Sequence, residues 1–270
     1  MRSAIFKRKV EQADVTMRRG LEGRHAVVTG GSRGIGLAVA GALTGAGATV
    51  TVLGRRAEAL ERVVAEGRAH GGAVADVADP AALRKAVDDA ASVRGPVDIM
   101  VANAGAAASA PFLKSDGALF RSMLDVNLMG VVNAAQAVLG PMTERGSGRI
   151  VAVASTAGLK GYPYVSAYCA AKHAVVGLVR ALAAETARSG VTVNAVCPGF
   201  TDTDLVADSL DRIVEKTGRG RDAALAELVK HNPQGRLIEP GEVADAVLWL
   251  CGDGARSVTG QAIAVAGGEI

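Results

Sequence analysis

Short valine-rich segments alternate with helical patterns along the whole chain, which has 270 residues. The segments at 25–29, 97–102 and 149–155 carry few polar residues, as expected for strands that are buried on both faces. Strands that alternate with helices form parallel sheets through right-handed crossovers. We therefore predict an α/β fold, a single-domain doubly wound parallel sheet with helices on both faces and its binding site at the carboxyl ends of the strands. The other predicted strands are 48–53, 73–77, 191–196 and 262–266, and the predicted helices are 34–46, 57–66, 80–93, 115–143, 165–185, one or two within 204–230, and 240–251.

The composition indicates one globular domain. No Pro/Ser-rich linker, repeat or low-complexity tract interrupts the chain, so we predict a domain over 21–270 preceded by a flexible N-terminal arm over 1–20. The arm is charged and lacks the apolar core of a secretory signal. Aromatic residues make up only 3% of the chain, and the net charge of +3 forms no basic stripe. Nucleic acid is therefore not expected as a partner.

The cysteines, the histidines and the apolar runs narrow the class of protein further. The three cysteines are odd in number and scattered, which favours reduced thiols and a cytoplasmic location. The four histidines show no ligand spacing, so no metal site is predicted. The longest uncharged run, 126–143, contains Asn127, Asn133 and Gln136. We interpret it as a buried helix and not as a membrane span.

A glycine-rich turn follows the first predicted strand and reads TGGSRGIG over 29–36. A turn of this kind at the start of a helix exposes backbone N–H groups and the positive helix end to a pyrophosphate. The spacing differs from the common GxGxxG pattern, and a glycine turn alone is weak evidence. Its position between a strand and a helix is the context that a dinucleotide site requires. We therefore expect a dinucleotide to contact this turn, at Gly30, Ser32, Arg33, Gly34, Ile35 and Gly36.

A tyrosine and a lysine lie four residues apart in the helical pattern after the fifth predicted strand. Tyr168 and Lys172 share one helix face, and Ser155 can approach them from the strand end. A phenol titrates near pH ~10, and a fixed cation nearby favours its ionised form. A hydroxyl beside it can hold a carbonyl oxygen as charge develops. These residues predict a site that moves a proton on or off an alcohol or carbonyl oxygen, although the spacing alone also fits a helix in which Tyr168 and Lys172 only pack.

These motifs, together with Asp76-Val77, Asn103-Ala104-Gly105, Asn127 and Pro198-Gly199, resemble the short-chain dehydrogenase/reductase family. They occur in that family's order, and the resemblance covers residues 21–268. It implies a Rossmann-like fold and hydride transfer between NADP(H) and a carbonyl or secondary alcohol. The chain is most similar in pattern to members that reduce 3-oxoacyl groups on acyl-carrier protein.

The resemblance implies a catalytic set of Asn127, Ser155, Tyr168 and Lys172. Ser155 and Tyr168 would hold the substrate oxygen, and Tyr168 would transfer the proton. Lys172 would lower the pKa of Tyr168 and bind the nicotinamide ribose. The main-chain carbonyl of Asn127 would hold a water that links Lys172 to solvent. From its spacing alone, Asn127 could equally be an asparagine that bends a helix.

The resemblance also implies cofactor contacts beyond the glycine turn. From the residues alone, Asp76 and 103–105 could be ordinary turns. As family positions, Asp76 would contact the adenine amine, and 103–105 would line the adenosine ribose. The implied contacts are Arg55, Asp76, Val77, Asn103, Ala104, Gly105, Tyr168, Lys172, Pro198, Gly199, Thr201 and Thr203.

The end of the second predicted strand points to NADP(H) in preference to NAD(H). Enzymes that use NAD usually place Asp or Glu there, against the ribose hydroxyls. Here Gly54 is followed by Arg55 and Arg56, and Arg33 lies in the glycine turn. Arg33 and Arg55 can approach a 2′-phosphate from two directions, and arginine suits phosphate contact. The alternative is that both are solvent-exposed loop arginines.

We predict an NADPH-linked reductase of a 3-oxoacyl thioester or similar ketone. The first alternative is an NAD-linked alcohol or 3-hydroxyacyl-CoA dehydrogenase of a degradative pathway. The second is a dinucleotide-sensing binding protein, which has no need of the proton relay that Asn127, Ser155, Tyr168 and Lys172 would form.

Two further expectations concern the substrate and the assembly. Residues 199–236 are predicted to form a substrate flap, in which apolar residues are followed by Lys216, Arg219, Arg221, Lys230 and Arg236. These cations would suit the phosphates of acyl-CoA or acyl-carrier protein, or would be a solvated helix face. The flap is longer than in the usual acyl-carrier reductases. The predicted helices 115–143 and 165–185 are apolar nearly all round and build the subunit interface in the family, which predicts a homotetramer.

Overall fold

The computed structural model describes residues 20–218 and 220–270, so the N-terminal arm before Gly20 lies outside the described residues. The strands are β1 (His25–Thr29), β2 (Thr49–Gly54), β3 (Gly71–Val74), β4 (Val97–Ala102), β5 (Gly148–Val153), β6 (Val191–Pro198) and β7 (Ala262–Val265). They form one parallel seven-stranded sheet in the order β3-β2-β1-β4-β5-β6-β7. The helices are α2 (Gly34–Gly45), α3 (Ala57–Ala65), α4 (Pro80–Arg94), α5 (Gly117–Leu124), α6 (Gly130–Glu144), α7 (Ser166–Thr186), α8 (Asp204–Thr217), α9 (Arg221–Val229) and α10 (Pro240–Cys251). The predicted doubly wound fold is confirmed.

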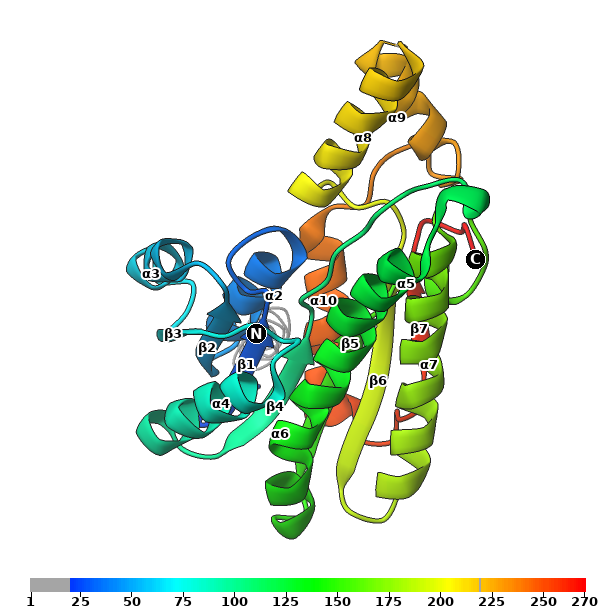
Figure 1. The fold of residues 1–270 in the computed structure, drawn as a ribbon. Coiled ribbons are helices and arrows are strands. Elements are labelled where there is room, and N and C mark those ends of the chain that lie inside the picture. Colours follow the sequence, from blue (N-terminus) through cyan, green and yellow to red (C-terminus); the bar gives the residue numbers. More distant parts are fainter. Residues whose placement is uncertain (1–19, 219) are drawn as a thin grey trace, which may run out of the picture.

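The sheet is buried on both faces because neighbouring strand residues point to opposite sides and both are apolar. Val27, Met100 and Ile150 pack in the core that α4, α6 and α7 cover. Val28 and Val101 pack in the second core, beneath α2, α3 and α10. Figure 1 shows the sheet between these two layers of helices. The carboxyl ends of all seven strands therefore meet at one edge.

Two predicted elements differ in detail from the structure. The third strand was predicted over 73–77 but ends at Val74. The Asp76 carboxylate accepts a hydrogen bond from the Ala78 amide, 3.0 Å away, and this local turn competes with further pairing to the sheet. The helix predicted over 115–143 is divided into α5 and α6 by a π-turn at Asp125–Met129. The stretch within 204–230 forms two helices, α8 and α9.

The predicted flap rises above the carboxyl edge of the sheet. Figure 1 shows α8 and α9 at the top of the molecule, away from the two helical layers. Its returning chain lies beside the turn that follows β6, where Thr201 and Ile238 form a short parallel bridge. The flap is thus fixed at its base and free of the sheet along its helices.

Two apolar helical stretches, Gly117–Glu144 and Ser166–Thr186, are long enough and apolar enough to cross a membrane by length and composition alone. In the structure they cover one face of the sheet, and Val138 and Val175 are buried in its core. Their apolar character is explained by this packing, as in the core helices of many folded domains.

Candidate active site

Three of the predicted catalytic side chains converge at the carboxyl edge of the sheet. Ser155 follows the end of β5 by two residues, and Tyr168 and Lys172 lie in the first two turns of α7. Tyr168 is hydrogen-bonded to Ser155. The Lys172 ammonium lies 5.7 Å from the centre of the Tyr168 ring and donates to the Val153 carbonyl, 2.9 Å away. The strand end and the helix face thus bring a phenol, a hydroxyl and a cation together.

Burial sets the protonation of these groups. Desolvation raises the pKa of Tyr168 to about 12, while the hydrogen bond from Ser155 opposes the rise. Desolvation also lowers the pKa of Lys172 to about 8, and only 4% of this residue is exposed. The pKa of Tyr168 is therefore raised on balance, whereas the sequence predicted that Lys172 would lower it. Removal of the phenolate from water outweighs a cation that lies 5.7 Å from the ring centre.

Asn127 lies at the centre of the π-turn and is fully buried. Its amide nitrogen donates to the Ala106 and Met123 carbonyls, at 2.9 and 3.0 Å. Its amide oxygen accepts from the Ala106 nitrogen, at 3.3 Å. π-turns within α-helices frequently occur at functional sites. The side chain of Asn127 therefore ties the bent helix to the chain that follows β4.

Gly105 lies between the side chains of Asn127 and Lys172. A Cβ atom on Gly105 would lie 2.8 Å from the Asn127 amide oxygen and 3.7 Å from the Lys172 nitrogen. The first distance is shorter than Cβ contacts in folded proteins, so a side chain at position 105 would clash with Asn127. A glycine is thus required where the segment after β4 passes between Asn127 and Lys172.

The glycine turn lies at the end of β1, beside the segment that follows β4. Asn103 donates to the Thr29 carbonyl at 3.0 Å, and the amides of Asn103 and Ala104 both donate to the Thr29 hydroxyl at 3.0 Å. A Cβ on Gly36 would lie 2.3 Å from the Gly30 carbonyl oxygen. The strand order reverses between β1 and β4, which is where doubly wound sheets bind their ligands.

The start of α2 is suited to a phosphate group. Arg33 occupies the N-cap without a side-chain capping bond, and the first turn, which contains Gly34, Ile35 and Gly36, carries no acidic residue. Its backbone N–H groups and the positive end of the helix can therefore face an anion. A Cβ on Gly34 would lie 3.1 Å from the Thr203 methyl group, so the turn also lies against the flap, at the N-cap of α8.

Of the two arginines predicted to hold a 2′-phosphate, Arg33 lies in this turn and Arg55 follows the end of β2. Arg33 pairs with Asp204 at 3.2 Å, and Arg55 lies 3.9 Å from Asp76. All four side chains are largely exposed, so both pairs are weak and can exchange partners. Gly54, at the end of β2, has Ser32 as its neighbour, with 3.9 Å between the Ser32 hydroxyl and a Cβ on Gly54. No carboxylate follows β2 at the position that NAD enzymes use.

The remaining predicted cofactor residues lie along the same edge. Val77 is buried, and its carbonyl accepts from Asn133 on α6 at 2.8 Å. Pro198 ends β6, and the next amide, that of Gly199, donates to the Val265 carbonyl at 3.0 Å. Thr201 is buried and donates to the Gly199 carbonyl at 3.0 Å, whereas Thr203 occupies the N-cap position of α8 without a side-chain capping bond. The structure thus places every predicted site residue at the carboxyl edge.

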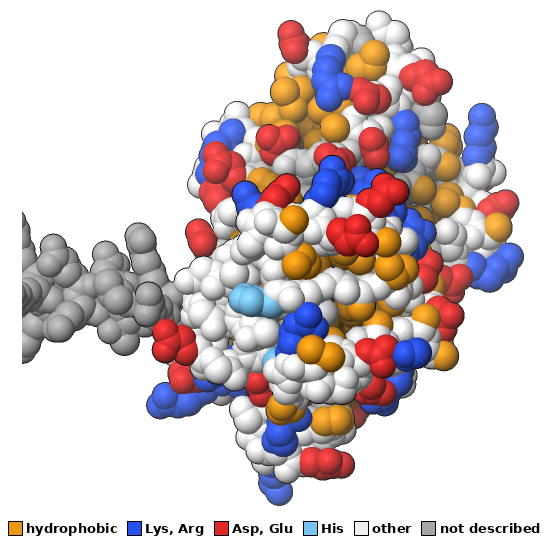
Figure 2. Space-filling model, turned by 90° about the vertical axis from the view of Figure 1, so that its left-hand side faces the viewer, with side chains coloured by type: hydrophobic (Ala, Val, Ile, Leu, Met, Phe, Trp, Pro, Cys, Tyr) orange, Lys and Arg blue, Asp and Glu red, His pale blue; other side chains and the backbone are white. Residues whose placement is uncertain are grey.

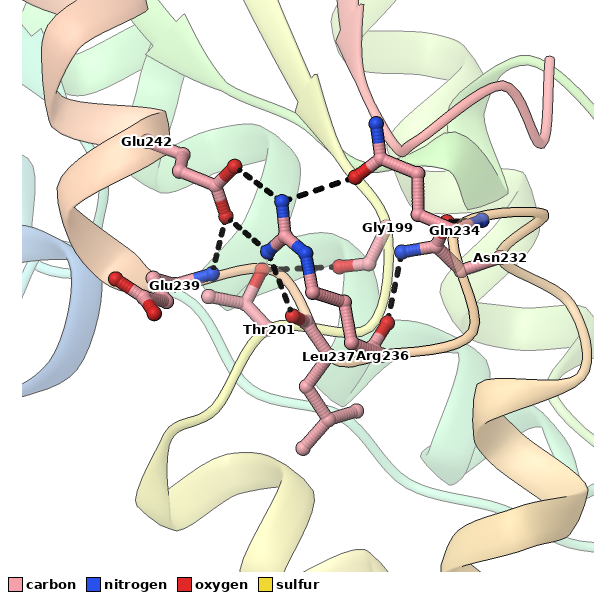
Figure 3. A network of polar contacts seen from close by, with 8 residues as sticks. All are labelled: Gly199, Thr201, Asn232, Gln234, Arg236, Leu237, Glu239 and Glu242. Atoms are coloured by element: carbon pink, nitrogen blue, oxygen red, sulfur yellow. Dashed lines mark hydrogen bonds and ion pairs between the residues drawn. The ribbon is translucent and has the colours of Figure 1, made fainter.

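The base of the flap is fixed by a network around Arg236, drawn in Figure 3. Arg236 donates to both carboxylate oxygens of Glu242 on α10, at 2.6 and 2.7 Å, and to Gln234 at 2.9 Å. This pairing holds the pKa of Glu242 at about 2. Asn232 donates to the Arg236 carbonyl at 2.7 Å. The end of the flap is therefore held in one geometry on α10.

A second polar cluster beside the site was not predicted from the sequence. Tyr162 lies between Ser155 and Tyr168 in the chain, and its hydroxyl contacts Glu269 and Thr156. Lys160 pairs with the same carboxylate at 3.0 Å. No spacing rule connects Glu269 with Tyr162, because 107 residues separate them. The only sign of this cluster in the sequence was that Lys160 and Tyr162, between Ser155 and Tyr168, had been given no role.

Comparison with known proteins identifies the family. A family model described as short chain dehydrogenase matches residues 24–213. The chain belongs to the short-chain dehydrogenase family. It is 37% identical over 253 residues to an acetoacetyl-CoA reductase of Rhizobium meliloti, covering 91% of this chain and 98% of that protein. It is 40% identical over 250 residues to a cis-4-hydroxycyclohexanecarboxylate dehydrogenase of Sinomonas cyclohexanicum, with 91% and 96% covered.

A solved short-chain dehydrogenase structure agrees with this assignment. The chain superposes on a variant of actinorhodin polyketide ketoreductase solved with NADPH, with a TM-score of 0.87, 38% identity, and 91% and 97% of the two chains covered. The predicted family and fold are thus confirmed. As a member of the short-chain dehydrogenase family, this chain is an oxidoreductase that uses a nicotinamide dinucleotide and acts on alcohol or ketone groups.

The buried ammonium of Lys172 predicts an unusual stability effect. Its pKa is lowered to about 8, below that of an unfolded lysine, so at pH 7 the charged form destabilises the fold. Lys172→Met is expected to raise the unfolding free energy at pH 7 by on the order of 1–2 kcal/mol, since the relieved desolvation exceeds the lost hydrogen bond to Val153. Between about pH 8 and about pH 10.5, Lys172 keeps its proton in the unfolded state but has lost it in the folded state. The wild type therefore regains stability relative to the variant as pH rises through this range.

Urea unfolding at pH 7 and at about pH 10 would measure both effects, with the exposed Lys114→Met as a control that should change neither. A Lys172→Met variant that is less stable than the wild type at pH 7, with no change in the difference at high pH, would contradict the assignment of a buried charge.

Proposed function

We propose that the protein is an NADPH-linked reductase of a 3-oxoacyl thioester or similar ketone. The observation that carries the proposal is the convergence of Ser155, Tyr168 and Lys172 beside a glycine turn that has arginines, and no carboxylate, near the end of β2. The acetoacetyl-CoA reductase and the polyketide ketoreductase solved with NADPH support this substrate class and cofactor.

The donor set at the carboxyl edge fits a dinucleotide. The start of α2 offers uncapped N–H groups, Gly36 leaves no space for a side chain, Arg33 lies in the turn, and Arg55 follows the end of β2. In this proposal, the turn over 30–36 holds the pyrophosphate, Arg33 and Arg55 hold the 2′-phosphate, and Asp76 and Val77 flank the adenine. Asn103, Ala104 and Gly105 line the adenosine ribose, Lys172 holds the other ribose, and the segment 198–203 faces the nicotinamide. When bound, the cofactor supplies the hydride.

The proton chemistry follows from the protonation of the site. Ser155 and Tyr168 donate hydrogen bonds to the substrate oxygen, which gains negative charge as the ketone is reduced. With its pKa raised to about 12, Tyr168 carries its proton at neutral pH, which is the form needed to give that proton to the oxygen. Lys172, charged below pH 8, stabilises the resulting phenolate. In this proposal the main-chain carbonyl of Asn127, in the π-turn, would hold a water that completes the path by which Tyr168 is reprotonated.

The flap gives little support to a phosphate-bearing carrier. Arg221 contacts Asp211, Lys230 contacts Glu227, and Arg236 is held by Glu242. Arg219 lies outside the described residues. Figure 2 shows basic, acidic and hydrophobic side chains intermixed on the flap at the top of the molecule. We therefore favour a small ketone or a short acyl thioester over recognition of acyl-carrier protein through these cations.

One observation favours the alternative of an alcohol dehydrogenase. The relative with 40% identity is a dehydrogenase of a hydroxycyclohexane carboxylate. Oxidation needs Tyr168 as a base, and a pKa of about 12 disfavours that form. Rates measured in both directions on a panel of ketones and alcohols, with both cofactors, distinguish the two functions.

We also propose a cytoplasmic homotetramer. On α7, Ala170, Gly177, Ala181 and Ala184 are exposed, together with His173, Arg180 and Glu185. A helix face rich in small residues, with few charges, suits a symmetric contact with a second copy. Light scattering at micromolar concentration is expected to give four chains, and a monomeric mass would contradict the proposal.

Tyr168→Phe tests the proposed proton donor. The change removes only the titrating oxygen, so turnover of the ketone is expected to fall at least 10²-fold while NADPH affinity stays within about twofold. Steady-state rates and fluorescence titration of NADPH measure the two quantities, and Tyr164→Phe, at an exposed tyrosine of the same segment, is the matched control. A variant that keeps more than about a tenth of the wild-type rate would refute the role of Tyr168.

Arg55→Ala tests the proposed cofactor. Loss of a charge-assisted contact to the 2′-phosphate is expected to lower kcat/KM for NADPH about tenfold or more and to leave kcat/KM for NADH unchanged. Arg188→Ala, at an exposed arginine just beyond the end of α7, is the control. A wild type that prefers NADH, or an Arg55→Ala variant that keeps its NADPH selectivity, would be incompatible with the proposal.

A further inference from the structure

We propose that Glu269, the penultimate residue of the chain, is a positioning residue that fixes the substrate flap relative to Ser155 and Tyr168. The inference rests on the proposed function only in that the positioned groups act on a ketone. It stands on the contacts of a carboxylate that has no part in the proton chemistry described above.

The Glu269 carboxylate is buried, with 2% of the side chain exposed. Its Oε1 atom accepts from the Tyr162 hydroxyl at 2.6 Å and from the Lys160 ammonium at 3.0 Å. The Tyr162 oxygen also lies 2.7 Å from the Thr156 hydroxyl. The phenol has one proton, so it donates to the carboxylate and accepts from Thr156. A buried carboxylate requires such partners, and the directions of their hydrogen bonds fix its place.

This chain of contacts leads directly to the proposed catalytic pair. Thr156 is buried and follows Ser155 in the sequence, and the Ser155 hydroxyl accepts from the Ala157 amide at 3.1 Å. The segment between Ser155 and Tyr168 therefore begins at the catalytic hydroxyl and passes through Tyr162. Tyr164, in the same segment, has a φ of 66°, a conformation that is costly for a bulky side chain. Such a conformation persists only where surrounding contacts hold the segment.

The same cluster touches both ends of the flap. The Tyr162 ring lies 6.0 Å from the Phe200 ring and 5.9 Å from the His231 ring, in edge-to-face geometry. Phe200 precedes α8 and His231 follows α9. The Phe200 and His231 rings are 5.9 Å apart, so the two ends of the flap close against Tyr162.

The C-terminal tail, residues 266–270, contacts the flap beside these three aromatic rings. A Cβ on Gly199 would lie 3.1 Å from the Glu269 Oε2 atom, and a Cβ on Gly267 would lie 1.9 Å from the Asn232 oxygen. The tail thus contacts the chain where it enters the flap and where it leaves it. Asn232 in turn belongs to the Arg236 network in Figure 3, which anchors the flap to α10. Glu269 is therefore the charged group at which the catalytic segment, the flap and the tail meet.

An ion pair between the buried Glu269 carboxylate and the half-buried Lys160 adds little net stability, but its hydrogen bonds restrict the geometry of the groups that it joins. Removal of the carboxylate would free Tyr162 and let the flap move relative to Ser155. The cluster contacts the segment 198–203 at Gly199 and Phe200, but in the described residues no contact joins it to the start of α2, where the phosphates of the cofactor are proposed to bind. The expected signature is a weaker binding of ketone with cofactor binding unchanged.

Glu269→Ala and Glu269→Gln test the inference by steady-state kinetics on a ketone that the wild type reduces. We expect the KM for the ketone to rise at least tenfold in Glu269→Ala and less in Glu269→Gln, which keeps an acceptor oxygen for Tyr162. We expect kcat to change less than threefold and the NADPH dissociation constant less than twofold. The control is Glu144→Gln, at an exposed carboxylate at the far end of α6, which should match the wild type.

A double-mutant cycle with Tyr162→Phe shows whether Glu269 acts through the tyrosine. The double variant of Tyr162→Phe and Glu269→Ala is expected to be no worse than Glu269→Ala alone, because both changes break the same hydrogen bond. Amide hydrogen exchange, which needs no activity, is expected to rise at 156–164 and at both ends of the flap in Glu269→Ala and in Tyr162→Phe, which removes a single oxygen. Wild-type ketone KM and unchanged exchange in these variants would overturn the inference, and equal losses of kcat and NADPH affinity would also overturn it. A wild type without ketone reductase activity would instead refute the proposed function, while the exchange data would still decide the role of Glu269.

Discussion

The buried ammonium of Lys172 is the interaction on which the site depends. It lies beneath Tyr168 and is held by the Val153 carbonyl at the end of β5. No carboxylate neutralises it among the contacts of the described residues. A fold keeps such a charge only where the gain lies elsewhere, because desolvation of an ammonium is costly. The free-energy cost of burying the Lys172 ammonium is consistent with a catalytic function, in which the cation is needed only when Tyr168 loses its proton.

The geometry around this charge also explains the direction of the chemistry. A phenol with a pKa of about 12 beside a lysine with a pKa of about 8 is an acid pair at neutral pH. Both groups carry a proton, and the site can give one proton to a substrate oxygen without first taking one from solvent. Gly105 and Asn127 lie against the lysine from the other side, so the segment after β4 and the π-turn form part of the same arrangement.

The sequence predicted the sheet well, and the residues of the proposed site lie together at its carboxyl edge, because both follow from patterns that are local in the chain. Strand hydrophobicity, the turn over 29–36 and the i, i+4 spacing of Tyr168 and Lys172 each act over a few residues. The pKa of Tyr168 was predicted in the wrong direction because the cation was visible in the sequence and the burial was not. The cluster of Lys160, Tyr162 and Glu269 was missed because the chain returns to it only after the last strand. The pairing of Arg33 with Asp204 likewise depends on how the flap sits over the glycine turn.

The pH dependence of kcat/KM for ketone reduction by NADPH is the most direct test of this account. This ratio reports the titration of groups in the free enzyme, where the pKa of Lys172 is about 8 and that of Tyr168 about 12. The account predicts a constant kcat/KM at neutral pH that falls as pH rises through about 8, because Lys172 loses the charge that supports proton transfer from Tyr168. A kcat/KM that rises with pH across this range would show that the deprotonated site is the reactive form, and would contradict the account.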